Sequence, residues 1–261
     1  MIRALISAIA AVAATVVVYA GQQAQPQSPA PQKIWWGTPN KNFLVLVPVS
    51  GTWNADYEKY DTKFVQVLTI DGAAARRAPD ADAARMLFGD KSAGFVTALA
   101  APGAFPLAVA RDIKAFPPSP VKTLSGGKLG VSFKLVSGAT DQTAGIVVGL
   151  QPDGSYTFVQ YNAKDGNVAV GKFEKGVRTV LQQGEVHQQL PLNQWHTLEV
   201  TIGPDYTRTG AVVSASVKGS TLAVRHTLPA PVQGRVGVWT KADSVTSFKD
   251  FVAVPLYLGP R

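Results

Sequence analysis

The fold of this chain is decided by its C-terminal stretch, which opens with Asn-Gln-Trp-His-Thr-Leu-Glu-Val-Thr-Ile at residues 193–202. It closes with Gly-Arg-Val-Gly-Val-Trp-Thr-Lys-Ala-Asp-Ser-Val-Thr-Ser-Phe-Lys-Asp-Phe at 234–251. Apolar and polar residues alternate in both parts, and a period of two places every second side chain on the same face of a strand. The stretch therefore predicts β-strands with one buried face each.

The same alternation begins further upstream, where Val131, Phe133 and Leu135 are separated by polar residues. Glycine adopts the positive φ that hairpin turns require. Glycine pairs typical of such turns interrupt the apolar runs at Asp153-Gly154, Asp165-Gly166, Lys175-Gly176 and Lys218-Gly219. Short strands joined by hairpins predict an all-β fold with antiparallel strands in a two-sheet sandwich.

The composition agrees with this prediction. The 261 residues include 24 glycines and 18 prolines, only 16% are charged, and 46% are hydrophobic, which is enough to bury one core. Cysteine is absent, which excludes disulfides and thiolate sites. The formal net charge is +8, but no basic cluster is longer than Arg76-Arg77, so we predict no nucleic acid partner. The charge favours either simple solubility or attraction to an anionic polymer of the cell envelope.

The N-terminus has the pattern of a secretory signal peptide at residues 1–20. Arg3 precedes an uncharged, apolar run at 4–20, which ends in the small-residue motif Val18-Tyr19-Ala20. We therefore expect cleavage after Ala20, an extracytoplasmic location (periplasmic or secreted) and no stable membrane insertion afterwards. An uncleaved anchor is the alternative, because the run is close to the shortest length that spans a bilayer.

The rest of the chain predicts a linker and one domain. Residues 21–33 are rich in Gln and Pro and predict the linker. Residues 34–261 predict a single β-sandwich domain, with an irregular part at 34–120 and a regular core at 121–254. Within the irregular part, the sequence predicts strands at Phe43–Val47 and Lys63–Ile70, a short helix at Asp80–Leu87 with Asp80 as N-cap, and an irregular Pro-rich stretch at Lys114–Val121.

Part of the chain also resembles a known family. The stretches that carry the resemblance are 105–109, 136–148, 156–167, 175–181, 194–198 and Val-Trp-Thr-Lys-Ala-Asp-Ser-Val at 238–245. They are similar to concanavalin A-like (laminin G-like) jelly-roll domains related to the bacterial 3-keto-disaccharide hydrolase family. The resemblance implies a jelly-roll sandwich, a carbohydrate partner and hydrolase or lyase chemistry on 3-keto-glycosides. Relatives commonly carry Arg, Asn and an acidic residue where this chain has Gly149, Ser155 and Thr227, which implies an altered polar site here.

Acidic residues argue against glucanase chemistry. Most glycosidases use two carboxyl groups that flank the glycosidic bond to be cleaved. Related jelly-roll glucanases carry these carboxyl groups at every second position of one strand. The chain has four glutamates, and none lies in a run of the Glu-x-Asp-x-Glu type: Glu58, Glu174, Glu185 and Glu199.

The remaining candidates for catalysis are His196, Asp243, Glu185 and His187. His187 lies two residues from Glu185 and could form an acid–base pair with it, with solvated loop residues as the alternative. His196 shares parity with Leu198, so we expect its ring to point inward, and a hydrogen-bonded structural histidine is the alternative. The three histidines do not have the spacing of metal ligands.

Asp243 and Asp250 flank the last predicted strand and are candidates for a structural calcium site. Calcium takes six to eight oxygen ligands, so capping of turns by these carboxylates is the alternative. We predict no other cofactor.

Binding candidates come from the motif Gly-Arg-Val-Gly-Val-Trp. Period two places Arg235 and Trp239 on one face of a strand, with Gly237 between them, and points Val236 and Val238 into the core. An exposed indole beside a cation suits a sugar, whereas a covering N-terminal segment would make Trp239 a packing residue. Two further ligand-binding candidates lie in the stretch 156–167, and they are Tyr156 and Gln160. Among the other tryptophans, we expect Trp53 to pack against a strand and Trp195 to lie in the core.

Together these features predict an exported, non-catalytic protein that binds glycans or the cell surface through a carbohydrate or an anionic envelope polymer. A hydrolase or lyase acting on 3-keto-glycosides is the first alternative, and a structural domain of the envelope is the second.

Overall fold

The computed structural model describes residues 46–60, 63–72, 79–100, 104–114 and 120–255. The predicted signal peptide, its cleavage site and the linker lie outside the described residues, as do positions 43–45 of the first predicted strand.

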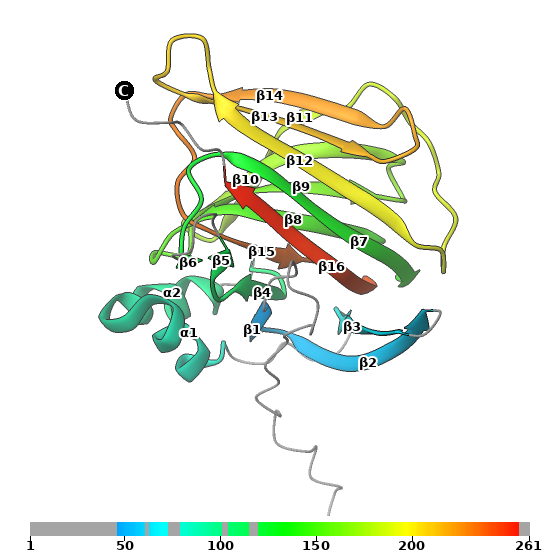
Figure 1. Cartoon of the computed structure of the whole chain (residues 1–261), viewed down its shortest axis with the longest axis horizontal. Coiled ribbons are helices and arrows are strands. Elements are labelled where there is room, and N and C mark those ends of the chain that lie inside the picture. The colour runs from blue at the N-terminus through cyan, green and yellow to red at the C-terminus, as the bar shows by residue number, and fades with distance from the viewer. Residues whose placement is uncertain (1–45, 61–62, 73–78, 101–103, 115–119, 256–261) are drawn as a thin grey trace, which may run out of the picture. The chain divides into compact units, whose positions relative to one another are not determined.

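Two antiparallel sheets of seven strands form the domain (Figure 1). Sheet A has the order β1 (Leu46–Ser50), β4 (Leu107–Ala110), β15 (Arg235–Trp239), β8 (Thr143–Leu150), β9 (Tyr156–Asn162), β10 (Asn167–Glu174) and β11 (Val177–Gln183). Sheet B has the order β14 (Ala223–Leu228), β13 (Ala211–Val217), β12 (His196–Pro204), β7 (Gly127–Ser137), β16 (Val245–Pro255), β3 (Lys63–Asp71) and β2 (Thr52–Tyr60). The short strands β5 (Ile113–Lys114) and β6 (Pro120–Val121) pair separately. The predicted all-β, two-sheet antiparallel fold is confirmed.

The main core lies between the two sheets. Alternate residues of both sheets meet there, among them Phe133, Ile146, Tyr161 and Phe248. The rings of Phe133 and Tyr161 lie 5.9 Å apart and join β7 of sheet B to β9 of sheet A. The period-two pattern of the sequence therefore marks the buried face of each sheet correctly.

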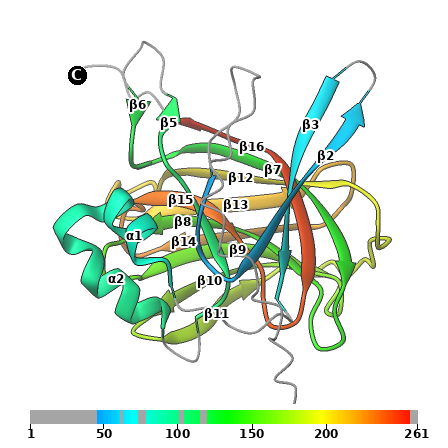
Figure 2. The same ribbon diagram turned by 90° about the horizontal axis from the view of Figure 1, so that it is seen from below.

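A second apolar cluster covers part of the outer face of sheet A. Helices α1 (Ala81–Phe88) and α2 (Ser92–Leu99), joined by a 3₁₀ turn at Gly89–Lys91, supply Leu87 and Phe95 to this cluster. Their partners on the sheet include Trp239 of β15. Figure 2 shows the two helices together at one side of the sandwich. The outer face of sheet A is consequently not open to solvent along its whole width.

Helix α1 begins where the sequence predicts. Asp80 Oδ1 accepts hydrogen bonds from the backbone N–H groups of Asp82 (3.0 Å) and Ala83 (2.9 Å), which satisfies donors that the first turn leaves free. Strand β3 confirms the strand predicted at Lys63–Ile70. The sequence does not predict α2, because its N-terminus has no capping side chain and its residues are apolar on most sides.

Candidate functional site

The predicted binding face on β15 has the expected parity but not the expected exposure. Val236 and Val238 point into the main core, and Trp239 points to the outer face of sheet A. The indole is fully buried, with the rings of Phe158 and Phe105 centred 4.9 Å and 5.8 Å away. The expectation of an exposed Trp239 is therefore wrong, and the alternative of a cover from the N-terminal part is confirmed.

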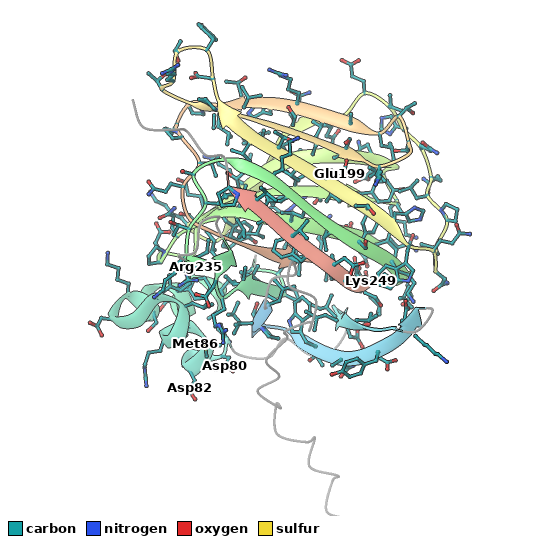
Figure 3. All side chains as sticks on the ribbon, in the orientation of Figure 1. Asp80, Asp82, Met86, Glu199, Arg235 and Lys249 are labelled. Carbon is teal, nitrogen blue, oxygen red and sulfur yellow. The ribbon has the colours of Figure 1, made fainter. Side chains whose placement is uncertain are left out.

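Arg235 is also buried and holds the helix pair against the sheet. Its guanidinium donates to the carbonyl oxygens of Ala110 (3.3 Å), Arg111 (3.0 Å) and Leu87 at the end of α1. Figure 3 shows Arg235 beside α1, where Met86 is labelled. Burial lowers the pKa of Arg235 because it disfavours the charged form. The expectation that Arg235 faces solvent is wrong, because sequence parity cannot show that two helices cover this face.

The other two binding candidates lie on β9. Tyr156 is buried and stacks on Phe173 with ring centroids 5.1 Å apart, and burial raises its pKa well above the ordinary value. Gln160 is also buried, but it lies beyond the helices' apolar cluster, and its Oε1 accepts a hydrogen bond of 2.7 Å from Arg178 Nη2. Gln160 therefore leads to the site that the structure favours.

This site, the polar cluster, occupies the outer face of β8, β9 and β10 beside Trp239. Register places Thr143 opposite Asn162 and Asn162 opposite Asn167. At the next position on the same face, two residues along each strand, Trp239 is opposite Gly145, and Gly145 is opposite Gln160. We define the polar cluster as the side chains of Thr143, Gln160, Asn162, Asn167 and Arg178 together with the Nε1 edge of Trp239.

Two glycines make room for the aromatic rings beside the cluster. A Cβ atom on Gly145 would overlap the indole of Trp239, and one on Gly171 would overlap the ring of Phe158. Both rings therefore lie directly on the backbone of the sheet. The Arg178 guanidinium carbon lies 4.7 Å from the centroid of the Phe158 ring.

Unpartnered atoms distinguish this cluster from the rest of the described chain. Five buried side-chain nitrogen or oxygen atoms have no hydrogen-bond partner, and four of them belong to the cluster: Thr143 Oγ1, Asn167 Oδ1, Arg178 Nε and Trp239 Nε1. Buried polar groups in proteins nearly always have a partner, and each exception needs an explanation. The four atoms comprise two N–H donors, one carbonyl acceptor and one hydroxyl that can do both. This set matches the hydroxyl and ring oxygen atoms of a sugar.

A network of charged groups lies at one end of the cluster. Asn162 Nδ2 donates to Asp141 Oδ1 (3.0 Å) and Asp165 Oδ2 (2.8 Å), and Lys241 Nζ lies 2.9 Å from Asp141 Oδ1. Asp243 supports the same loop, because its carboxylate accepts hydrogen bonds from consecutive backbone N–H groups at 139–141. These bonds, from Thr140 and Asp141 above all, lower the pKa of Asp243 to about 2. The network fixes the orientation of Asn162.

The predicted catalytic residues are not brought together as a group. His187 Nδ1 lies 2.8 Å from the carbonyl oxygen of Asp165, and no hydrogen bond in the described part of the chain joins it to Glu185. His196 Nε2 lies 3.1 Å from the Pro191 carbonyl oxygen, and its ring packs against Phe133 at 5.6 Å. The contacts of His196 agree with the alternative of a hydrogen-bonded structural histidine, and His187, exposed between β11 and β12, agrees with the alternative of a solvated loop residue.

The two predicted calcium ligands lie apart from each other, one before β16 and one within it. Asp243 precedes the strand and is occupied by backbone N–H groups, whereas Asp250 sits in its middle, at a bulge with φ of 55°. Each strand residue advances about 3.3 Å, so the two carboxylates do not share one ligand shell. Burial raises the pKa of Asp250. Among the described residues, no group of three or more His, Cys, Asp or Glu could hold a metal ion.

A separate groove of about 210 Å³ lies where the resemblance implies an altered polar site. Its lining includes Gly149, Ser155 and Tyr156 from the β8–β9 hairpin and the segment 228–233. The polar groups here have partners, since Lys172 pairs with Glu174 at 2.9 Å and the Gln151 amide donates to the Gly149 carbonyl at 3.0 Å. The polar cluster is therefore the stronger candidate site.

Trp195, expected in the core, lies partly exposed just before β12. Its Nε1 donates to Glu58 Oε2 (2.9 Å), and the ammonium groups of Lys134 and Lys249 lie 4.8 Å and 3.9 Å from the ring centroid. The expectation for Trp195 is wrong, because its position shares the parity of the exposed Glu199 on β12 and so places the ring on the outer face of sheet B, beside Lys134. Figure 3 labels Lys249 on β16.

Sequence reasoning missed Arg178, Thr143, Asn162 and Asn167. One signal was available in Tyr-Thr-Phe-Val-Gln-Tyr-Asn at 156–162, where period two places Gln160 and Asn162 on the face opposite the core residues. Arg178 comes from the edge strand β11, and its long side chain reaches across β10 to Gln160. No local pattern predicts that reach.

The chain matches no protein-family model and no curated protein. Among solved structures, it is similar to the carbohydrate-binding module CBM66 from Bacillus subtilis, with 13% identity, 82% of this chain and 96% of that chain covered, and a TM-score of 0.52. It also matches a β-1,3-1,4-glucanase (lichenase) from a mouse hindgut metagenome at 12% identity, with 87% and 95% of the two chains covered and a TM-score of 0.44. A Bacillus subtilis protein of unknown function with a galectin-like fold matches at 10% identity, with 78% and 90% covered and a TM-score of 0.40.

These identities carry information about the fold alone. The narrower resemblance to the 3-keto-disaccharide hydrolase family stays a prediction. Within the described residues, no helix is both long and apolar enough to cross a membrane. The strand order and the match to the carbohydrate-binding module together show that this chain has the two-sheet jelly-roll fold of the concanavalin A-like type.

Proposed function

We propose that this protein is an exported, non-catalytic glycan-binding protein and that its polar cluster contacts the sugar. The observation that carries the proposal is the set of four buried, unpartnered polar atoms on one face of sheet A. Sugars offer many hydroxyl groups that both donate and accept, so they match the donors, the acceptor and the hydroxyl of this set alike. Arg178 lies on the edge strand β11 and is partly exposed, which gives a ligand a side from which to approach.

Three further observations support the proposal. The carbohydrate-binding module named above has the same fold. The cluster contains amide, hydroxyl, indole and guanidinium groups, which orient polar ligands. The signal-peptide pattern at residues 1–20 favours export, where glycans of an envelope or a medium are available.

A matched pair of threonine variants tests the assignment in the full chain. Thr143 and Thr246 are both fully buried, but Thr143 Oγ1 has no partner whereas Thr246 Oγ1 donates to the Thr143 carbonyl at 2.8 Å. Thr143→Val removes an unpaired hydroxyl, so we expect the free energy of unfolding to rise by about 1 kcal/mol. Thr246→Val removes a paired hydroxyl, so we expect a fall of about 1 kcal/mol.

The two variants should also differ in their affinity for sugars, and here only Thr143→Val, the variant with the more stable fold, should be impaired. Isothermal titration with oligosaccharides of glucose, xylose, fructose and galacturonate should find at least one ligand for the wild-type chain. Thr143→Val should weaken its binding about fivefold, the equivalent of about 1 kcal/mol, and Thr246→Val should leave it unchanged. If no sugar in the panel binds, the result contradicts the proposal and favours the structural role in the envelope.

The second candidate function is hydrolase or lyase activity on 3-keto-glycosides. One observation favours it, because the Asn162 amide draws the carboxylates of Asp141 and Asp165 onto a single nitrogen. Two carboxyl groups close together are the usual equipment for acid–base work on a glycosidic bond. The test is turnover of a 3-keto-disaccharide, which should be lost in Asp141→Asn and in Asp165→Asn. Absence of turnover in the wild-type chain removes this candidate.

A further inference from the structure

Arg178 is the one member of the polar cluster that carries a charge, and its surroundings differ from those of Arg235, the buried arginine of the same sheet. The guanidinium lies over Phe158 at 4.7 Å and near Trp239 at 5.8 Å, measured to the ring centroids. Its single hydrogen bond in the described chain is the one to Gln160 Oε1, at 2.7 Å. Its Nε is buried and unpartnered.

Arg235 provides the comparison within the same sheet. Its guanidinium donates to three backbone carbonyl oxygens, which offset the loss of water around the charge. Arg178 has one neutral amide oxygen in their place. Burial lowers the pKa of Arg178 through the same loss of solvation, yet an arginine side chain keeps its proton in proteins. A half-buried cation without a counter-ion is costly unless something else supplies the negative charge.

No carboxylate of the described residues forms an ion pair with Arg178. Two carboxylates, those of Asp141 and Asp165, stabilise the charge of Arg178 from a distance. Asp141 is paired with Lys241 at 2.9 Å and accepts from Asn162, and Asp165 also accepts from Asn162 at 2.8 Å. Their oxygens are therefore directed to other partners, and the Arg178 Nε–H remains free.

We propose that Arg178 binds an anionic group on the sugar, so that the ligand class is an acidic glycan with a carboxylate or a sulfate. The inference rests on the function proposed above and deepens it. The guanidinium Nε–H has no acceptor among the described residues, and the unpartnered Trp239 Nε1–H is a second donor in the same cluster. Arginine recognises carboxylate and phosphate oxygens through paired N–H donors of its own guanidinium, and a sulfate offers oxygens of the same kind. The net charge of +8 would also draw an anionic polymer toward the protein.

The experiment compares trigalacturonate with its methyl ester, which has the same sugars without the charge. Titration into the full chain should show binding of the acid about tenfold to a hundredfold tighter than the ester, the range for hydrogen bonds to charged groups. A sulfated disaccharide in a parallel arm distinguishes the two sources of anion. A preference for the sulfated ligand that depends on Arg178 also supports the inference and identifies sulfate as the group.

Arg178→Gln is the test variant and Arg225→Gln its matched control. Arg225 is exposed on β14 of sheet B, so its loss removes one charge without touching the cluster. We expect Arg178→Gln to weaken binding of the acid about tenfold to a hundredfold more than binding of the ester, so that the preference for the acid is lost. Arg225→Gln should keep the preference. Arg178→Lys keeps the charge but not the planar donors, and it should retain only part of the preference.

Two measurements protect the test against a folding defect. Thermal unfolding of Arg178→Gln by circular dichroism shows whether the variant is folded. Raising the salt concentration with the wild-type chain alone should weaken binding of the acid and leave binding of the ester unchanged. Equal affinity of the wild-type chain for acid and ester, together with no Arg178-dependent preference for the sulfated disaccharide, overturns the inference and leaves the proposed function standing. Absence of binding to every sugar contradicts the proposed function itself.

Discussion

Trp239 gives the sharpest test of the fold, because its indole lies in the second apolar cluster, which also contains Leu87 and Phe95 of the helix pair. The side chain is fully buried between Phe105 and Phe158 and lies on Gly145. Truncation of a buried tryptophan to alanine costs about 3–5 kcal/mol. In a domain of this size, each kcal/mol lowers the melting temperature by about 2–4 °C, so Trp239→Ala should lower it by about 6–20 °C.

The N–H of the same indole is unpartnered, which adds a second expectation. Trp239→Phe loses some packing but also removes a buried donor that costs about 1–3 kcal/mol when unpaired, so its net effect should be far smaller than that of Trp239→Ala. Urea unfolding followed by circular dichroism measures all variants, and Tyr206→Ala, at a side chain 97% exposed, serves as the control with a change under about 0.5 kcal/mol. If Trp239→Ala costs no more than the control, the second apolar cluster does not exist as described.

Four further outcomes follow from individual contacts. A methyl group on Gly145 overlaps the Trp239 indole, so Gly145→Ala should cost at least about 1–3 kcal/mol in urea unfolding, whereas Gly203→Ala, with no atom near its added Cβ, should be nearly neutral. The pKa of Asp243 lies below its ordinary value, so its stabilising effect is complete above about pH 4 and is lost as the pH falls to about 2. The difference in melting temperature between wild type and Asp243→Asn should therefore shrink over that range, and a constant difference would contradict the assignment. Burial alone would raise the pKa of Glu58, but hydrogen bonds from Lys134 and Lys249 outweigh it and lower the pKa. Glu58→Gln should therefore lower the free energy of unfolding by about 0.5–1 kcal/mol and speed hydrogen exchange in the β2–β3 hairpin. EDTA should leave the melting temperature of the wild-type chain unchanged, and a fall would show a structural metal ion.

Much of the architecture could be predicted from local pattern. Alternation in β7 and β15 placed Val131, Phe133, Val236 and Val238 in the core, because a strand's period of two fixes which face each side chain takes. The cap at Asp80 located helix α1, since the first turn of a helix has free N–H groups that a carboxylate satisfies. These signals act over a few residues, and the sequence contains them in full.

The site could be predicted only in part. Gln160 was among the expected binding residues and lies in the polar cluster, whereas Arg178 makes its contacts from an edge strand 18 residues further along the chain. Trp239 and Arg235 were placed on the correct face and given the wrong environment, because the cover comes from helices more than a hundred positions earlier in the chain. Exposure depends on what packs over a face, and that is a property of the tertiary structure.

The sequence by itself determined the class of fold, the strand parity and the helix start, since each of these follows from the covalent period of the chain and from local hydrogen bonding. Tertiary packing alone decided which part of the outer face of sheet A was covered by α1 and α2 and which part kept polar atoms without partners. The physical reason is that a strand fixes the direction of a side chain but not its neighbours. Those neighbours come from distant segments, whose positions are set only when both apolar clusters are buried together.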